Sequence, residues 1–211
     1  MKITIIYDNE AFDERLAGDW GFSCLIEVFN RKILFDTGAN GDILLENMNK
    51  LNIDPLIVDE IFISHDHWDH IGGLSAFLKI NKARVYIPYS CPEPVGAREV
   101  IKIKEPLMLH ENIFSTGELK NAEQSIIIKH NEDVVVVAGC SHPGVGEILE
   151  AASKHGKVGT LIGGLHGFKE FDLIDNLKKI CPTHCTKFIH KISELYPDKY
   201  IEGGAGKVIT I

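Results

Sequence analysis

The sequence predicts a layered α/β fold in which two β-sheets pack face to face and helices cover the outside. Short strand-like runs mix with amphipathic helical segments and form at least two strand-rich blocks separated by helices. In the second block, Val134–Val137 and Thr160–Ile162 show no polar face, as expected of strands covered on both sides. The first strand is not followed by G-x-G-x-x-G, which disfavours a dinucleotide-binding sheet.

Strands are expected where short runs rich in β-branched and aromatic residues end at turn-forming residues. In the first half of the chain these runs are Lys2–Tyr7, Phe22–Phe29, Lys32–Asp36, Glu60–Ser64 and Arg84–Pro88. In the second half they are Gln124–Lys129, Val134–Ala138, Val158–Gly163, Lys199–Glu202 and Val208–Ile211.

Helices are expected where apolar residues recur at helical spacing. In Asp42–Leu51, for example, Ile43, Leu44 and Met48 share one face. The other predicted helices are Gly73–Ile80, Gly146–Lys154, Phe171–Ile180 and Lys187–Leu195. Residues 89–121 lack periodicity and contain several prolines, so they are interpreted as an irregular insert. Such an insert can form a lid or wall of a site, or simply a surface loop.

The bulk composition predicts a single domain over residues 1–211, large enough to bury a core. The net charge of −8 disfavours general affinity for nucleic acid or for an anionic membrane. No apolar run approaches the roughly 18 residues of a membrane-spanning helix, and the apolar run after Lys2 is too short for a signal-peptide core. The five cysteines are scattered and odd in number, which predicts reduced thiols and a cytoplasmic location.

The segment with the most chemical information is Ser64–Gly73, which follows a short apolar run. It contains His65, His67, Asp69 and His70 in the pattern H-x-H-x-D-H. Imidazole and carboxylate groups are the ligands that borderline divalent metals prefer. Because His65 and His67 are two residues apart, extended backbone points both rings to the same side, where they can bind one ion. Asp69 and His70 follow the turn and can face a second ion. The segment therefore predicts a metal site on a strand-to-helix loop.

Three further histidines stand beside glycine or proline near the end of a strand or a short connection. His142 follows the Val134–Ala138 strand, His166 follows the Val158–Gly163 strand, and His184 follows the predicted Phe171–Ile180 helix. Sites in layered α/β folds gather at such edges, so all three are candidate ligands. Asp36 also ends a strand. A buried carboxylate needs a partner and a metal-bound histidine needs its second ring nitrogen held, and one contact can meet both needs.

These motifs carry a resemblance to a known family. Phe35–Gly38 and Ser64–Gly73 look like the metallo-β-lactamase superfamily. Gly139–Gly144, Gly163–His166 and the His184-Cys185-Thr186 segment resemble the branch labelled 7,8-dihydropterin-6-methyl-4-(β-D-ribofuranosyl)aminobenzene-5′-phosphate synthase or metal-dependent hydrolase. The resemblance covers nearly the whole chain and implies an αββα sandwich with its site at one edge of the two sheets.

The resemblance also implies a ligand set. By this pattern the first metal is held by His65, His67 and His142. The second metal is held by Asp69, His70 and His184. Asp36 does not bind a metal but orients one of the ligands by a hydrogen bond. The superfamily usually has an aspartate that bridges both metals, and this chain has no obvious equivalent. His166 occupies that stretch, so the number of metals, and whether His166 or His184 is the outer ligand, stay open.

The function expected from these features is metal-dependent hydrolysis, in which water activated by one or two divalent ions attacks a phosphoester, lactone or other ester. Zinc is expected first, with iron or manganese as alternatives. Asp69 would be a ligand and proton acceptor, and His166 would donate a proton to the leaving group. The alternatives are a transferase that couples an arylamine ribosyl phosphate to a pterin methyl diphosphate, and a metal, redox or binding module without hydrolytic activity. The expected partner is a small anionic or ester substrate, and the oligomeric state is not predicted.

Overall fold

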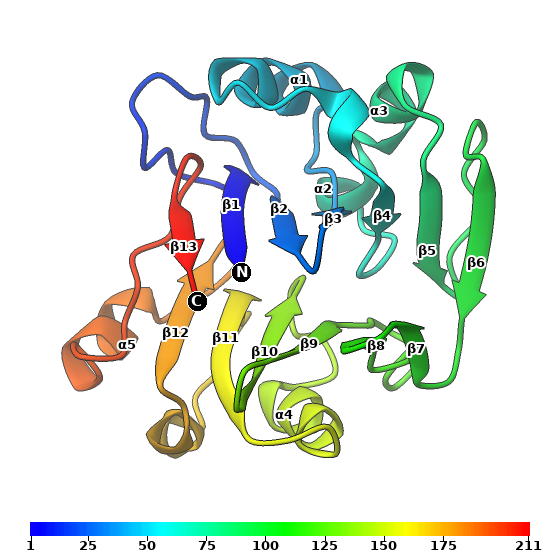
Figure 1. Cartoon of the computed structure of the whole chain (residues 1–211). Helices are drawn as coiled ribbons and strands as arrows, with labels where there is room; N and C mark the ends of the chain where they lie inside the picture. The colour runs from blue at the N-terminus through cyan, green and yellow to red at the C-terminus, as the bar shows by residue number, and fades with distance from the viewer. The chain divides into compact units, whose positions relative to one another are not determined.

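The computed structural model describes Met1–Ile211 and divides the chain into two compact units (Figure 1). Unit 1 comprises Met1–Lys102 and Gly203–Ile211, and unit 2 comprises Ile103–Glu202. Each unit has its own sheet, and the helices include none with the length and apolar character needed to cross a membrane.

The sheet of unit 1 has seven strands in the order β13-β1-β2-β3-β4-β5-β6 (Figure 1). Their bounds are β1 Lys2–Tyr7, β2 Ser23–Val28, β3 Arg31–Phe35, β4 Glu60–Phe62, β5 Arg84–Pro88, β6 Glu99–Ile103 and β13 Val208–Thr210. The strands β3, β4 and β5 are parallel, so the loops that follow them leave from the same edge of the sheet. That edge carries Asp36 and the histidine-rich segment.

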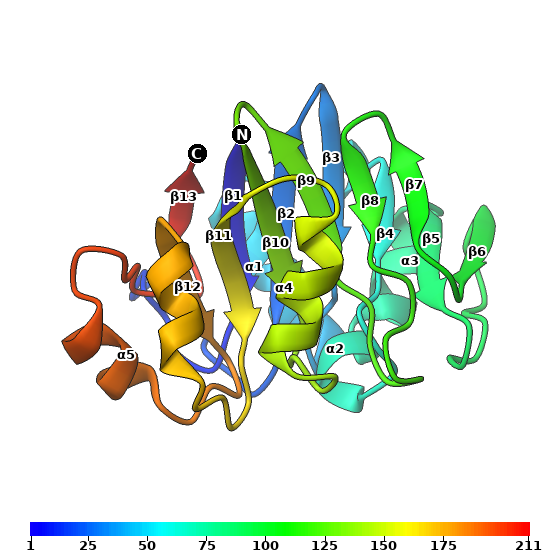
Figure 2. The same ribbon diagram turned by 90° about the horizontal axis from the view of Figure 1, so that it is seen from below.

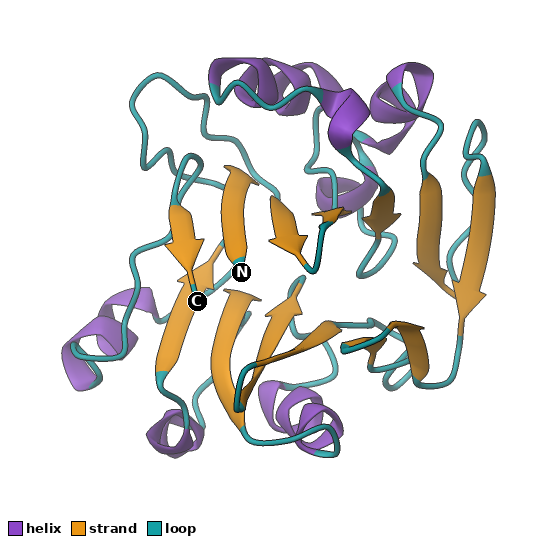
Figure 3. Cartoon of the chain, viewed as in Figure 1, coloured by secondary structure: helices purple, strands orange, loops and turns teal.

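The helices of unit 1 cover one face of its sheet (Figure 3). They are α1 Gly41–Lys50, α2 Trp68–Ile71 and α3 Leu74–Ile80, with a short 3₁₀ turn at Pro55–Ile57. The α1 helix begins where the Asn40 side chain accepts a hydrogen bond from the Asp42 N–H. Leu44 of α1 and Phe77 of α3 then pack with sheet residues such as Leu34 in one core.

The sheet of unit 2 has six strands in the order β12-β11-β10-β9-β8-β7 (Figure 2). Their bounds are β7 Leu107–His110, β8 Ile113–Ser115, β9 Ile126–His130, β10 Asp133–Ala138, β11 Val158–Gly164 and β12 Lys179–Thr183. Here β10, β11 and β12 are parallel neighbours, so their carboxyl ends also share one edge. The α4 helix, Val145–Ser153, lies on one face of this sheet (Figure 2), and α5, Ile189–Leu195, follows β12.

Three local predictions were wrong. Residues 89–121 are not irregular, because they contain β6, β7 and β8. The predicted Phe171–Ile180 helix is a 3₁₀ turn at Phe171–Asn176 followed by β12, whose buried residues pair with β11. The predicted Lys199–Glu202 strand reduces to an isolated bridge between Tyr200 and Ile180.

The error at Phe171–Ile180 has a physical reason. The apolar residues of this stretch are spaced as in a helix, but they divide between a short turn and a strand at the end of the sheet order. Pro182, which argues against a central strand, is tolerated in such a terminal strand. The other predicted strands are present with boundaries within three residues, and the predicted class of two sheets with helices is confirmed.

Candidate metal centre

Asp36 lies in unit 1 at the carboxyl end of β3 and has no exposed surface. Its carboxylate accepts hydrogen bonds from the Ser64 N–H and the Ser64 hydroxyl, both at 2.7 Å. The Nδ1 atom of His70 lies 2.7 Å from Asp36 Oδ2. This contact fixes the ring and directs Nε2 of His70 away from the carboxylate, as in a histidine prepared to bind a metal.

The three histidine rings of the H-x-H-x-D-H segment are clustered. His65 Nε2 lies 3.0 Å from His67 Nδ1, and the rings of His65 and His70 have centroids 4.2 Å apart. Two nitrogen ligands of one tetrahedral zinc are expected about 3.3 Å apart, from Zn–N bonds of about 2.05 Å. The His65 and His67 nitrogens therefore already have nearly the separation that two ligands of one ion require.

The loop after β3 is held tightly against the histidine segment. The Thr37 N–H and hydroxyl both donate to the His70 carbonyl, at 2.8 and 2.9 Å. A Cβ atom at Gly72 would lie 2.0 Å from the Ala39 carbonyl oxygen, so only glycine permits this approach.

The same loop is also held by Tyr7 of β1, whose hydroxyl accepts a hydrogen bond from the Asn40 N–H. Burial and the neighbouring Asp19 carboxylate raise the pKa of Tyr7 well above its ordinary value, so this hydroxyl stays neutral.

Trp20 is a neighbour of the site that the sequence interpretation missed. Its indole Nε1–H donates to Asp69 Oδ2 at 2.9 Å. Asp69 is buried, whereas the Trp20 side chain is about half exposed. The pair joins residues 49 positions apart, so no local pattern marks it.

The three candidate histidines of unit 2 follow the three parallel strands in order. His142 lies after β10, His166 after β11 and His184 after β12. The earlier prediction that a helix precedes His184 is corrected here, since β12 precedes it. The rings of His142 and His166 have centroids 5.2 Å apart. A cavity of about 760 Å³ opens beside these two histidines, and Phe168 and Glu147 are among the residues that line it.

Hydrogen bonds connect the three histidine loops of unit 2 with one another. The Ser141 hydroxyl donates to the Gly164 carbonyl, and the Gly164 N–H donates to the Gly139 carbonyl. The Thr186 hydroxyl accepts from the Leu165 N–H and donates to the Thr183 carbonyl. The loops are therefore held as one set.

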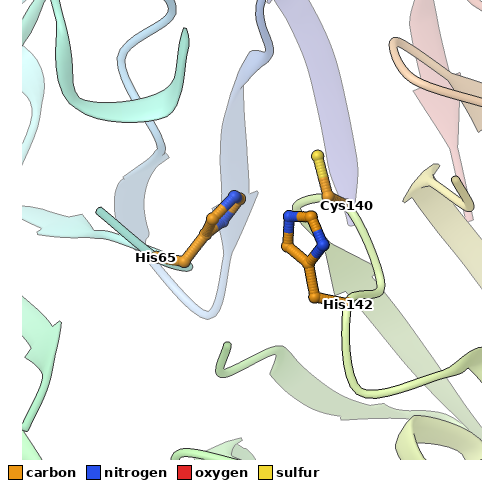
Figure 4. A group of neighbouring side chains, drawn as sticks. All are labelled: His65, Cys140 and His142. Carbon is orange, nitrogen blue, oxygen red and sulfur yellow. The ribbon is translucent and has the colours of Figure 1, made fainter. Parts of the chain in front are cut away.

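Cys140 is a second potential ligand on the His142 loop (Figure 4). Its Sγ lies within 4.8 Å of a ring nitrogen of His142, and within the same distance of a ring nitrogen of His184. The sequence predicts reduced thiols and does not single out Cys140, whose side chain is buried. Thiolate and imidazole are both zinc ligands, so this loop offers one donor more than the histidine pattern indicates.

Several residues of these loops have a left-handed backbone. The φ angles are +52° at Asp36, +47° at His166 and +49° at His184. Aspartate and histidine adopt this conformation more readily than most residues, but it still costs free energy. Such conformations gather where a loop must aim a side chain at a site, so the strain is consistent with a functional role for these positions.

Each unit supplies donor groups of the types that a divalent ion such as zinc prefers. Unit 1 offers clustered imidazoles and the carboxylate of Asp69, with a buried aspartate supporting His70. Unit 2 offers imidazoles and a thiol on loops that are connected by hydrogen bonds. These are the donor types and the supporting contacts that metal sites use.

Comparison with known proteins identifies the family. Residues 21–156 match the sequence model of the metallo-beta-lactamase superfamily. The chain belongs to this superfamily. This confirms the resemblance seen in the sequence, and the fold class with it.

Similar proteins support the same conclusion over the whole chain. The 7,8-dihydropterin-6-methyl-4-(beta-D-ribofuranosyl)-aminobenzene-5′-phosphate synthase of Methanocaldococcus jannaschii is 28% identical, covering 98% of this chain and 95% of that protein. An uncharacterised protein of the same organism is 29% identical over 99% of this chain and all of that protein. The crystal structure of a metal-dependent hydrolase of the beta-lactamase superfamily aligns over 100% of this chain and 99% of that chain, with a TM-score of 0.79 and 23% identity.

Proposed function

We propose that this chain is a metal-dependent hydrolase that cleaves a phosphoester, lactone or other ester in a small molecule. The main support is the pair of imidazole nitrogens, His65 Nε2 and His67 Nδ1, held 3.0 Å apart beside a His70 ring that Asp36 fixes. Membership of the superfamily gives this cluster a catalytic context.

The proposed ligands come from both units, which we propose act as one catalytic domain over residues 1–211. His65, His67 and His142 hold the first ion. Asp69, His70 and His184 hold the second, and Asp36 orients His70. Zinc is the first choice for this donor set, with iron or manganese as alternatives. A bound divalent ion supplies an activated water and stabilises negative charge on the reacting oxygen.

The chain's own residues supply the proton transfers. The Asp69 carboxylate, held by the Trp20 indole through Oδ2, accepts a proton from the attacking water. His166, which lines the 760 Å³ cavity together with His142, donates a proton to the leaving group. The cavity receives the substrate, and its size suits a small molecule rather than a polymer.

Metal content per chain, measured by elemental analysis of protein purified without chelator, tests the proposal first. We expect one or two ions. Two ions would mean that the second ligand set binds without a bridging aspartate, and one ion would indicate the His65, His67 and His142 set alone. No retained ion, even after reconstitution with zinc, would contradict the hydrolase proposal and favour a binding module.

The His67→Ala variant tests the role of the histidine pair. We expect loss of metal retention and of ester hydrolysis, because the variant removes one of the two nitrogens of the pair. His190→Ala, which changes an exposed histidine of α5, is the matched control and keeps both properties. Hydrolysis by metal-free His67→Ala protein at the wild-type rate would contradict the scheme.

A second candidate is a transferase of the dihydropterin synthase type, which the 28% identity to the archaeal synthase over nearly the full length favours. A pterin methyl diphosphate, incubated with and without an arylamine ribosyl phosphate, separates the two candidates. Diphosphate release only when both substrates are present supports the transferase. Release in water alone supports the hydrolase.

A further inference from the structure

The turn between β8 and β9 places a carboxylate, that of Glu123, in the interior of unit 2, with no exposed surface. Its Oε1 atom accepts hydrogen bonds from the N–H groups of Gly139, Cys140 and Ser141, at 2.8, 3.0 and 3.2 Å. Its Oε2 atom accepts from the N–H of His142 at 3.0 Å. Four consecutive backbone N–H groups therefore converge on one buried carboxyl group.

This arrangement determines the path of the loop. Successive N–H groups that turn toward one point form an anion-binding concavity, and hydrogen bonds to a charged acceptor are about twice as strong as neutral ones. The carbonyl groups are used on other sides, since Gly139 accepts from Gly164 and Ser141 accepts from Gly144. Ser141 has a φ angle of +60°, which turns the chain immediately before His142. The loop has little freedom to move the Cα atom of His142.

We propose that Glu123 is a positioning residue for His142, and that its carboxylate sets the direction in which this imidazole presents its ligand nitrogen. The inference rests on the proposed metal centre. Glu123 would act on His142 through the backbone of the ligand loop and not as a metal ligand itself.

The two carboxylate oxygens allow a selective change. In Glu123→Gln, the amide oxygen can occupy the Oε1 position and keep the three bonds to Gly139, Cys140 and Ser141. The amide NH₂ then faces the His142 N–H, so a donor meets a donor and this one hydrogen bond is lost. The variant should loosen the loop at the ligand itself while leaving most of its support.

The experiment measures three quantities: zinc affinity by competition with a chromophoric chelator, thermal unfolding of the metal-free protein, and the visible absorption spectrum of the cobalt-substituted protein.

The control variant for Glu123→Gln is Ser115→Ala. Ser115, the last residue of β8, is also fully buried, and its hydroxyl donates to the Gln124 side chain and accepts from the Gly117 N–H rather than bonding the 139–142 loop. We expect Glu123→Gln to weaken zinc binding by about 10–100-fold and to change the cobalt spectrum, as loss of a ligand's support does. Ser115→Ala should lower thermal stability with wild-type affinity and spectrum.

The outcomes are distinct. Zinc affinity and cobalt spectrum unchanged in Glu123→Gln would overturn the inference, as would equal losses of affinity in Ser115→Ala. If Glu123→Gln does not fold, Glu123→Asp replaces it under the same criteria, because it keeps the charge but withdraws it by one methylene group. Wild-type protein that binds no zinc would instead show that the proposed function fails.

Discussion

Both units use a fully buried carboxylate to support candidate metal ligands, but the two carboxylates bond different kinds of atom. In unit 1, Asp36 contacts the side chain of a candidate ligand directly, at His70 Nδ1, and holds the neighbouring Ser64. In unit 2, Glu123 accepts hydrogen bonds from four backbone N–H groups and holds the loop that carries His142. One carboxylate orients a ring and the other orients a stretch of main chain.

The difference follows from how the ligands are distributed along the chain. The candidate ligands of unit 1 lie within six residues, so fixing one ring and one short loop organises all of them. The candidate ligands of unit 2 follow the ends of three parallel strands, so each loop needs its own orienting contacts. Backbone anchors such as Glu123 and Thr186 serve that purpose, whereas a single side-chain contact could fix only one of the three.

The largest effect is expected from Asp36→Ala. The substitution removes the acceptor of three buried hydrogen bonds, so the free energy of unfolding should fall by about 3 kcal/mol, and zinc affinity should fall as well. Chemical denaturation of the metal-free protein and chelator competition measure the two quantities.

Asn47→Ala is the matched control for this variant. Asn47 is also fully buried in unit 1, and its side chain makes three hydrogen bonds to backbone atoms of Ile6 and Ala17. It should cost a similar free energy of unfolding and leave zinc affinity unchanged. If both variants lost affinity equally, Asp36 would be a general stability residue and the comparison of the two carboxylates would fail.

The same contrast explains what could be predicted from the sequence. Asp36 could be predicted because it ends a strand and the ligands it supports lie in one compact motif. Glu123 could not, because its partners are 16–19 residues away, and the turn that carries it was next to a segment interpreted as an irregular insert. His184 was found as a candidate, but its strand was mistaken for a helix because the apolar spacing before it fits both.

An intermediate effect is expected from Thr186→Val. Valine keeps the shape of the side chain but removes the hydroxyl that joins the Leu165 N–H to the Thr183 carbonyl. The loss of two buried hydrogen bonds should lower the free energy of unfolding by about 2 kcal/mol. It should also loosen the His166 and His184 loops relative to each other, although the hydrogen bond from the Lys187 N–H to the His166 carbonyl still joins them. If hydrogen bonds to the backbone orient the candidate ligands of unit 2, the variant should bind fewer zinc ions per chain than the wild type when zinc is below saturation. Full metal content with lowered stability would limit Thr186 to a structural role.

The smallest effect is expected from Trp20→Phe, which tests a hydrogen bond from a side-chain N–H to the carboxylate of a candidate ligand, Asp69. Trp20 reaches Asp69 from a side chain that is half exposed, so its hydrogen bond competes with water and should contribute about 1 kcal/mol. Phenylalanine keeps an aromatic ring at the position but cannot donate. We expect a small loss of thermal stability and about a tenfold loss of affinity for the ion that Asp69 is proposed to bind.

Trp68→Phe is the control for this last change, because it alters another exposed tryptophan of unit 1, next to Asp69 in sequence. Titration of metal-free protein with zinc should show weaker binding for Trp20→Phe than for Trp68→Phe. Equal affinity in the two variants would mean that the indole N–H does not support Asp69. In that case, the fully buried Asp36 would be the residue whose hydrogen bonds orient the candidate ligands of unit 1, and a hydrogen bond from a half-exposed side chain such as Trp20 would add nothing to zinc affinity.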